Sequence, residues 1–280
     1  MRIDLHTHSH VSDGTDSPEQ VMRDAHSAGL DVVALTDHDS TLGWEAAARQ
    51  ARDLGLIFVP GCEISAKYHG ISVHILAYLH DPTHERIRAH ETRVVTARRD
   101  RARLMVERLA EDFPITWDVV LDQTQPGTTV GRPHIADALV AVGVVPHRSA
   151  AFDTLLTTSS PYYVHHYAPD VIEAVEMIAQ AGGVSVFAHP GASARGEVVG
   201  DHTINGMIDA GLDGLEIHHR DNPPHQRERL TEIARRRGVL ITGSSDYHGD
   251  GKPNRLGENT TTQTVFAQIE ERGMGAVVRP

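Results

Sequence analysis

Short apolar runs of strand length alternate with helical segments along most of this chain, and that alternation restricts its fold more than any other feature. The predicted strands are residues 2–5, 31–36, 57–61, 184–188, 214–217 and 239–242, with a further extended segment at 72–78. The predicted helices between them are residues 18–29, 43–55, 169–182, 204–210 and 224–237. Strands that alternate with helices in this way indicate an α/β fold with a parallel sheet, such as a barrel.

The first helix has a clear start signal. Ser17 is suited to the N-cap position, Pro18 to the first helical position, and Gln20 can complete a capping box. We therefore expect this helix to begin at Pro18 and to end near Gly29.

The alternation is interrupted in the middle of the chain. Residues 84–163 have no strand signal, and their pattern predicts a long arginine-rich helix at 85–109 and shorter helices after Pro133 and near Phe152. We interpret 1–83 and 164–280 as one barrel, and 84–163 as a helical insertion that contributes to substrate recognition.

Composition excludes several classes of protein. The 280 residues contain no apolar run near the ~20 residues that a membrane span needs, and the chain opens into a strand pattern without a signal-peptide region. The net charge of −12 argues against a broad basic surface for nucleic acid, so no stable DNA binding is expected. The single cysteine, Cys62, allows no intrachain disulfide. A cytoplasmic location is the default expectation.

Metal-ligand residue types follow nearly every predicted strand. His6 and His8 lie two apart at the end of the first strand, so both side chains leave the same face and can share one ion. The other candidates are Asp13, Asp37-His38-Asp39, Glu63, His189, Asp246 and His248. The carboxyl ends of parallel strands converge on one mouth of a barrel, so these side chains are expected to meet there.

Each of these residues taken singly is more simply a capping aspartate or a buried histidine with a structural partner. Together they favour a metal site of two to three divalent ions. Mixed imidazole and carboxylate ligands suit Mn, Fe or Zn better than Mg or Ca, which prefer oxygen ligands.

The arrangement resembles the polymerase and histidinol phosphatase (PHP) superfamily. The matching motifs, in family order, are His6-Thr7-His8, Ser12-Asp13-Gly14, Thr36-Asp37-His38-Asp39, Pro60-Gly61-Cys62-Glu63, His74, Ala188-His189-Pro190 and Ser244-Ser245-Asp246-Tyr247-His248. This resemblance implies a distorted (β/α)7 barrel with up to three metals. The implied ligand sets are His6, His8, Glu63 and Asp246 for one ion, Glu63, His74 and His189 for a second, and Asp13, His38 and His248 for a third.

The charge of such a site favours phosphate chemistry. Three divalent ions and the carboxylates of Asp13, Glu63 and Asp246 leave about +3, which suits a phosphate dianion. We expect a metal-dependent phosphoesterase that uses a metal-bridging hydroxide and no nucleophilic side chain.

The insertion offers a candidate anion site at Gly131-Arg132-Pro133-His134. Pro133 can begin a helix whose free amides would favour an anion beside Arg132 and His134. Arg132 could instead pair with a structural carboxylate. Eight arginines lie between Arg86 and Arg108, and most are expected to form a solvated face. Arg99 and His219 complete the predicted substrate contacts.

Gly131-Arg132-Pro133-His134-Ile135-Ala136, with Glu216-Ile217-His218-His219 downstream, resembles the PHP branch that dephosphorylates nucleoside monophosphates and 3′,5′-bisphosphates, some members of which trim RNA from its 5′ end. The chain departs from that branch at residues 218–222, where relatives commonly have Tyr-His-Pro-Asp-His. The implied substrate is a small nucleotide, AMP or a nucleoside 3′,5′-bisphosphate, with short RNA as an alternative.

Other functions remain open at this point. One is a histidinol-phosphate phosphatase. Another is an amidohydrolase, but its usual bridging lysine would have to be Lys67 or Lys252, and neither ends a predicted core strand. The non-enzymatic alternative is an inert metal-binding module of the kind fused to polymerases.

Overall fold

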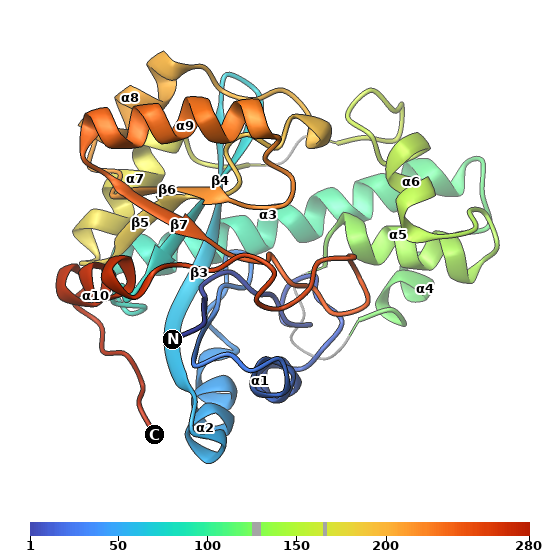
Figure 1. The fold of residues 1–280 in the computed structure, drawn as a ribbon. Helices are drawn as coiled ribbons and strands as arrows, with labels where there is room; N and C mark the ends of the chain where they lie inside the picture. The colour runs from blue at the N-terminus through green and yellow to red at the C-terminus, as the bar shows by residue number, and fades with distance from the viewer. Residues whose placement is uncertain (125–129, 165–166) are drawn as a thin grey trace.

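The computed structural model describes residues 1–124, 130–164 and 167–280. Seven strands form one sheet in chain order (Figure 1). Their bounds are β1 Ile3–Asp4, β2 Val32–Leu35, β3 Ile57–Tyr68, β4 Ile71–Tyr78, β5 Val184–Phe187, β6 Gly214–His218 and β7 Leu240–Gly243. A parallel bridge between Thr7 and Tyr247 joins the first and last strands beyond their ends, so the sheet is a nearly closed barrel. The predicted distorted (β/α)7 barrel is confirmed.

Strand β4 departs from the parallel arrangement that the alternation predicts. It pairs antiparallel with β3 and with β5, whereas the other neighbouring strands are parallel. His69 and Gly70 have φ values of 46° and 89°, which suit the tight turn that reverses the chain between β3 and β4. His74 lies early in β4 and pairs with Ser65 of β3. Ser65 lies in the part of β3 that extends beyond its pairing with the parallel strand β2, which ends at Pro60. The reversal therefore brings His74 to the mouth of the barrel.

Helices cover the outside of the barrel. They are α1 Pro18–Ser27, α2 Trp44–Leu54, α7 Val171–Gln180, α8 Asp201–Asp209, α9 Pro224–Arg237 and α10 Gln263–Arg272. The hydroxyl of Ser17 accepts a hydrogen bond from the amide of Gln20 at 3.1 Å, as the cap signal predicts. The Oε1 atom of Gln20, which would have to accept from the amide of Ser17 in a capping box, accepts from the guanidinium of Arg23 at 3.0 Å instead, so this half of the predicted capping box is wrong. Over the part of the chain described above, no helix has both the length and the apolar character to cross a membrane.

Alternate residues of the strands face two different cores. Val32 and Ala34 of β2 pack in a cluster with side chains of β1 and β5, which fills the barrel. Val33 and Leu35 pack outward against α1 and α2. This alternation explains why β2 is a continuous apolar run in the sequence.

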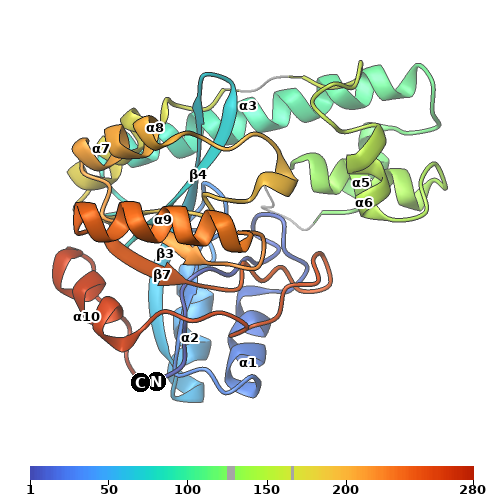
Figure 2. The ribbon, with the colours of Figure 1, turned by 45° about the horizontal axis from the view of Figure 1, so that its top comes forward.

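The helices between β4 and α7 extend to one side of the barrel (Figures 1 and 2). They are α3 Glu85–Ala110, α4 Trp117–Leu121, α5 Arg132–Ala141 and α6 Arg148–Thr154. Ile87, in the first turn of α3, belongs to a barrel cluster, whereas Met105 and Leu109 near its end belong to a separate cluster with α5. Helix α3 thus connects two hydrophobic cores.

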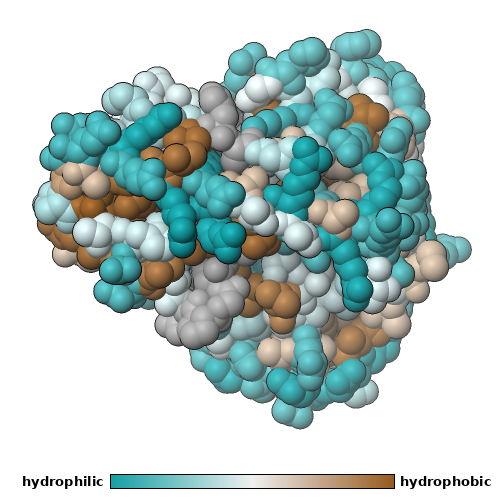
Figure 3. Space-filling view, turned by 180° about the vertical axis from the view of Figure 1, so that it is seen from behind, coloured by the Kyte–Doolittle hydropathy of each residue, from teal (hydrophilic) through white to brown (hydrophobic). Residues whose placement is uncertain are grey.

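Seen from behind, the molecular surface is mainly hydrophilic with smaller hydrophobic areas (Figure 3).

Candidate metal centre

Histidines and carboxylates from most of the strands meet at the mouth of the barrel. Among the residues that the structure describes, three groups have ligand atoms within 4.8 Å of one another: His6, His8, Glu63 and Asp246; His8, Asp13, His38 and His248; and His38, Glu63 and His74. The nine residues that the sequence predicts as ligands are therefore gathered in one place, with His189 joined to them through Glu63.

Glu63 lies at the centre of this cluster and is almost fully buried. Its Oε1 atom is 2.9 Å from Nδ1 of His74 and 3.2 Å from Nε2 of His189. Its Oε2 atom is 3.2 Å from Nε2 of His6 and 3.0 Å from Nε2 of His8. Oε2 is also 3.3 Å from Nδ1 of His38. One carboxylate in contact with five imidazoles is an arrangement that suits a bridging ligand.

His6 is oriented by a residue that the sequence analysis did not single out. Its Nδ1 atom lies 3.0 Å from Oε1 of Glu216, and both side chains are fully buried. A proton on Nδ1 of His6 leaves the lone pair of Nε2 free. This Nε2 lies 3.0 Å from Nε2 of His8, so two ring nitrogens face the same point.

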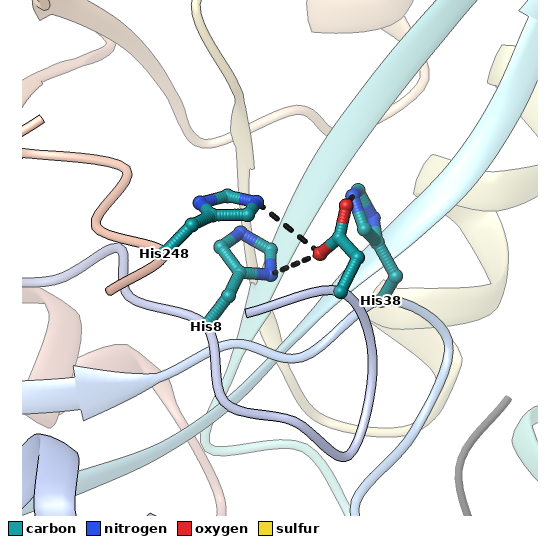
Figure 4. A group of neighbouring side chains, drawn as sticks. His8, His38 and His248 are labelled. Carbon is teal, nitrogen blue, oxygen red and sulfur yellow. Dashed lines mark ion pairs between the residues drawn. The ribbon is translucent and has the colours of Figure 1, made fainter. Parts of the chain in front are cut away.

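A second group forms around Asp13, which lies on the loop after β1. His8 and His248 direct ring nitrogens toward a carboxylate that lies between them and His38 (Figure 4). The Asp13 carboxylate is 3.2 Å from Nε2 of His248 and 3.8 Å from Nε2 of His38. Nδ1 of His248 lies 2.9 Å from the backbone oxygen of Asp246, so its Nε2 atom faces Asp13.

Asp246 has a different environment at each carboxylate oxygen. Its Oδ1 atom lies 3.4 Å from the Nε2 atoms of both His6 and His8. Its Oδ2 atom lies 2.7 Å from Arg195 and 3.1 Å from Lys252. Arg195 comes from a short 3-10 turn after β5, and Lys252 from the loop after β7. Neither residue was predicted as a site residue. Lys252 does not follow a core strand directly, but its loop brings it to the mouth of the barrel, beside Asp246.

Five residues other than glycine have a positive φ in the described part of the chain, and three of them lie at the mouth: Asp39, His189 and Asp246, with φ of 49°, 34° and 56°. Such values are uncommon outside glycine and concentrate at functional sites. His189 and Asp246 carry candidate ligands, and Asp39 directly follows one. The backbone at the mouth is therefore strained where the candidate ligands are held.

Burial keeps the outer imidazoles neutral. It lowers the pKa of His38 to about 3, and together with Arg195 it lowers the pKa of His189 to about 3. Burial and Lys252 lower the pKa of His248 to about 4. Neutral imidazole is the form that binds a metal ion.

The inner histidines respond mainly to the carboxylates. Burial alone would lower the pKa of His8, but hydrogen bonds with Asp246 and Glu63 outweigh it and raise that pKa to about 9. For His6 the carboxylates likewise outweigh burial, Glu216 most strongly, and its pKa is raised well above its usual value. Protons on these rings offset the same negative charge that a divalent cation would offset.

The residues fit a metal on geometric grounds as well. Nδ1 of His38, Nδ1 of His74 and Nε2 of His248 are buried and have no hydrogen-bond partner among the described residues. Carboxylate oxygens nevertheless lie 2.9 to 3.3 Å from them. A cation placed between such an imidazole nitrogen and the nearby carboxylate oxygen would be a ligand partner for both.

The cluster opens into a cavity of about 800 Å³ between the barrel and the helices α3, α5 and α6. Arg132 and His134, both predicted as substrate contacts, line it. So do Arg98 and Arg101 of α3, which the sequence analysis did not separate from their neighbours. Among the described residues, Arg101 and Arg132 have no ion-pair partner. This wall of the cavity therefore carries positive charge that a bound anion can offset.

The other two predicted substrate contacts lie elsewhere. Arg99 is outside the lining of the cavity: its side chain is 60% exposed and lies 3.9 Å from Asp100. His219 is fully buried behind the site, with Nε2 3.6 Å from Oδ2 of Asp246 and its ring tilted against that of His189, with the ring centroids 5.4 Å apart. His219 is thus placed to contact candidate ligands rather than the open cavity.

Comparison with known proteins gives consistent matches. Residues 4–113 match the model of the PHP domain. The chain is 32% identical to a 3′,5′-nucleoside bisphosphate phosphatase of Chromobacterium violaceum, over 99% of this chain and 98% of that protein. It is 30% identical to a 5′-3′ exoribonuclease of Haemophilus influenzae, over 92% and 94% of the two chains. A crystal structure from Bifidobacterium adolescentis, assigned as a metal-dependent phosphoesterase, superposes with a TM-score of 0.95 at 46% identity, covering 97% of this chain and 96% of that one.

Proposed function

The chain belongs to the PHP family of metal-dependent phosphoesterases, and on that premise we propose that it removes a phosphate monoester group from a small nucleotide. The proposed substrates are AMP and nucleoside 3′,5′-bisphosphates. The observation that supports the proposal is the cavity in which the buried His, Asp and Glu cluster faces Arg101 and Arg132, which have no ion-pair partner among the described residues. A negatively charged ester with a second polar end fits such a cavity.

The proposed ligands are those of the sequence analysis. One ion is held by His6, His8, Glu63 and Asp246, a second by Glu63, His74 and His189, and a third by Asp13, His38 and His248. Manganese, iron and zinc are the proposed metals, because imidazole and carboxylate ligands are mixed. The central place of Glu63 and the facing Nε2 atoms of His6 and His8 support these sets.

Bound divalent ions would supply an activated water and would offset the charge of the phosphate. The residues of the chain do the remaining work. Glu216 fixes the ring of His6, and the backbone oxygen of Asp246 fixes that of His248. Arg195 and Lys252 add positive charge on the open side of Asp246. The site is therefore arranged to receive a phosphate dianion without a nucleophilic side chain.

The insertion, residues 84–163, is proposed to bind the part of the substrate beyond the reacting phosphate. Arg132 is held by a hydrogen bond to the backbone oxygen of Leu156 and lies over the rings of Phe152 and Tyr163. Arg101 also lies over the Tyr163 ring and donates a hydrogen bond to the backbone oxygen of Val164. Both guanidinium groups are thus fixed in place, and His134 lies beside them on α5. A second phosphate of the substrate would offset their charge.

A substrate panel tests the proposal. The enzyme is assayed with AMP, adenosine 3′,5′-bisphosphate, a short 5′-phosphorylated RNA and histidinol phosphate, and kcat/KM is compared. The proposal expects a nucleotide to rank first. A short RNA in first place would support the exoribonuclease alternative, which the relative from Haemophilus influenzae favours. Histidinol phosphate in first place would contradict the proposal, and tightly bound metal with no hydrolysis would indicate the inert binding module.

A further inference from the structure

Asp39 directly follows the candidate ligand His38, yet its carboxylate is not part of the metal-binding groups. It is fully buried and its backbone has a φ of 49°. A buried carboxylate with a left-handed backbone persists only where its surroundings hold it firmly. The partners of Asp39 therefore determine the shape of the loop that carries His38.

Those partners come from two other elements. Oδ1 of Asp39 accepts a hydrogen bond from the amide of Ser65 in β3 at 2.8 Å. The same oxygen is 3.0 Å from Nε2 of His90, in α3. Oδ2 of Asp39 is 2.6 Å from the guanidinium of Arg98, also in α3. The carboxylate thus joins the end of β2 to the first helix of the insertion.

The backbone around Asp39 is tied to Glu63. The amide of Asp39 donates to the backbone oxygen of Glu63 at 3.1 Å, and the amide of Glu63 donates to the backbone oxygen of Asp37 at 3.2 Å. These bonds form a parallel bridge between His38 and Glu63. A displacement of Asp39 would therefore move two candidate ligands together.

Arg98 is the group that connects this junction to the cavity. Its guanidinium also donates to the hydroxyl of Ser65 at 2.5 Å, and its side chain is only 15% exposed. It lines the cavity together with Arg101 and Arg132. Further along α3, Met105 and Leu109 pack in the cluster that contains Ile135 and Leu139 of α5. Arg98 thus lies between the core of the insertion and the loop that holds His38.

We propose that Arg98 is a positioning residue that couples the insertion to the metal centre: through Asp39 it holds His38 in place for the ion bound by Asp13, His38 and His248. The inference rests on the metal centre proposed above. Its alternative is that Arg98 contacts only the substrate, in which case its removal would change KM and leave metal binding intact.

The neighbouring arginine provides a matched control. Arg98→Met removes the guanidinium from Asp39, whereas Arg99→Met removes one that is 60% exposed and outside the cavity. Both full-length variants and the wild type are stripped with a chelator and titrated with Mn²⁺. The number of bound ions is measured by elemental analysis after equilibrium dialysis, and the affinity by calorimetry.

Loss of a group that orients a metal ligand typically weakens metal binding ~10–100-fold. We expect Arg98→Met to weaken one class of Mn²⁺ sites to that extent, and Arg99→Met to bind as the wild type does. Asp39→Asn should weaken the same class, and the double variant should be no weaker than the worse single variant, because both changes break one contact. Unchanged Mn²⁺ stoichiometry and affinity in Arg98→Met, with only a raised KM, would overturn the proposal.

A conservative variant covers the case in which Arg98→Met does not fold. Arg98→Lys keeps one positive charge beside Asp39, so it should fold and lie between the wild type and the asparagine variant in Mn²⁺ affinity. Affinity in Arg98→Lys and Asp39→Asn equal to that of the wild type would also overturn the proposal. Failure of the wild type itself to bind Mn²⁺ would instead contradict the metal centre on which the inference rests.

Discussion

His6 and Glu216 are separated by 210 positions in the chain, yet Nδ1 of His6 lies 3.0 Å from Oε1 of Glu216 in a fully buried contact. The other oxygen of Glu216 accepts a hydrogen bond from the amide of His189 at 2.8 Å. One carboxylate on β6 therefore orients a ring at the end of β1 and the backbone at the end of β5. This contact leads to the first prediction.

Glu216→Gln should weaken metal binding without unfolding the protein. The amide keeps nearly the same shape but removes the charge that favours a proton on Nδ1 of His6. We expect a ~10–100-fold loss of affinity for at least one ion, measured by titration of the stripped protein. Glu228→Gln, on the exposed side of α9, is the control and should bind metal normally. Equal affinities in the two variants would contradict the role assigned to Glu216.

Hydrolysis should depend on His8 and on bound metal. Because Nε2 of His8 lies 3.0 Å from Oε2 of Glu63 and its ring also borders Asp13, His8→Ala removes a ligand atom from two of the groups. Phosphate release from the best nucleotide substrate should fall to the uncatalysed background. Chelation should do the same to the wild type, and added Mn²⁺ or Zn²⁺ should restore it. His26→Ala, on the exposed face of α1, should retain full activity. Activity that survives both chelation and His8→Ala would rule out the metal mechanism.

Arg132→Ala should discriminate between substrates with one and two phosphates. A hydrogen bond to a charged group contributes ~1.5–3 kcal/mol, or about 10–100-fold in KM. We expect KM for adenosine 3′,5′-bisphosphate to rise by that factor, while KM for a simple aryl phosphate changes little. Steady-state kinetics on both substrates provide the measurement, with Arg99→Ala as the control. Equal effects on the two substrates would indicate that Arg132 has a structural role.

Acid should destabilise the protein partly through His80. Its side chain is 2% exposed beside Trp44, and burial lowers its pKa to about 4 from the usual 6.5. Between pH 6.5 and pH 4 the unfolded chain binds this proton and the folded chain does not, so stability falls as the pH falls through that window. The loss from pH 7 to pH 5 is about 2 kcal/mol for this residue.

His80→Leu should remove that part of the acid sensitivity. Denaturant unfolding at pH 7 and pH 5, at a fixed metal concentration, should give a smaller difference for His80→Leu than for the wild type. An identical pH dependence in the two proteins would show that His80 is protonated in the folded state or does not contribute to the loss of stability in acid.

The sequence predicted those features that are encoded locally. Apolar runs such as Val32–Leu35 and helix signals such as Ser17-Pro18 placed most elements within a few residues. The position of each candidate ligand at a strand end then followed from the shared direction of parallel strands. Helix α10 was not predicted, although Thr262 caps it, because no strong apolar period marks its few buried residues.

Features that depend on distant contacts or on rotation of a helix were not predictable in the same way. The direction of β4 depends on the turn at His69-Gly70. The side-chain pattern of residues 72–78 would be the same in a parallel and in an antiparallel strand, so it could not indicate the direction. Glu216 begins the Glu216-Ile217-His218-His219 motif, but nothing near it in sequence indicates a contact with His6. Arg98 and Arg99 are adjacent and identical in type, so only the orientation of α3 decides which of them enters the cavity.

Helix α3 takes part in two hydrophobic cores, with Ile87 in the barrel and Leu109 in the insertion. Its 26 residues correspond to a rod about 39 Å long. Residues 84–163 are consecutive in sequence, yet excising them would also remove from the barrel a packed helical turn and two of the partners of Asp39, His90 and Arg98. The two parts are therefore not interchangeable modules: a substitution that loosens α3 in one of them is expected to lower the cooperativity with which both unfold.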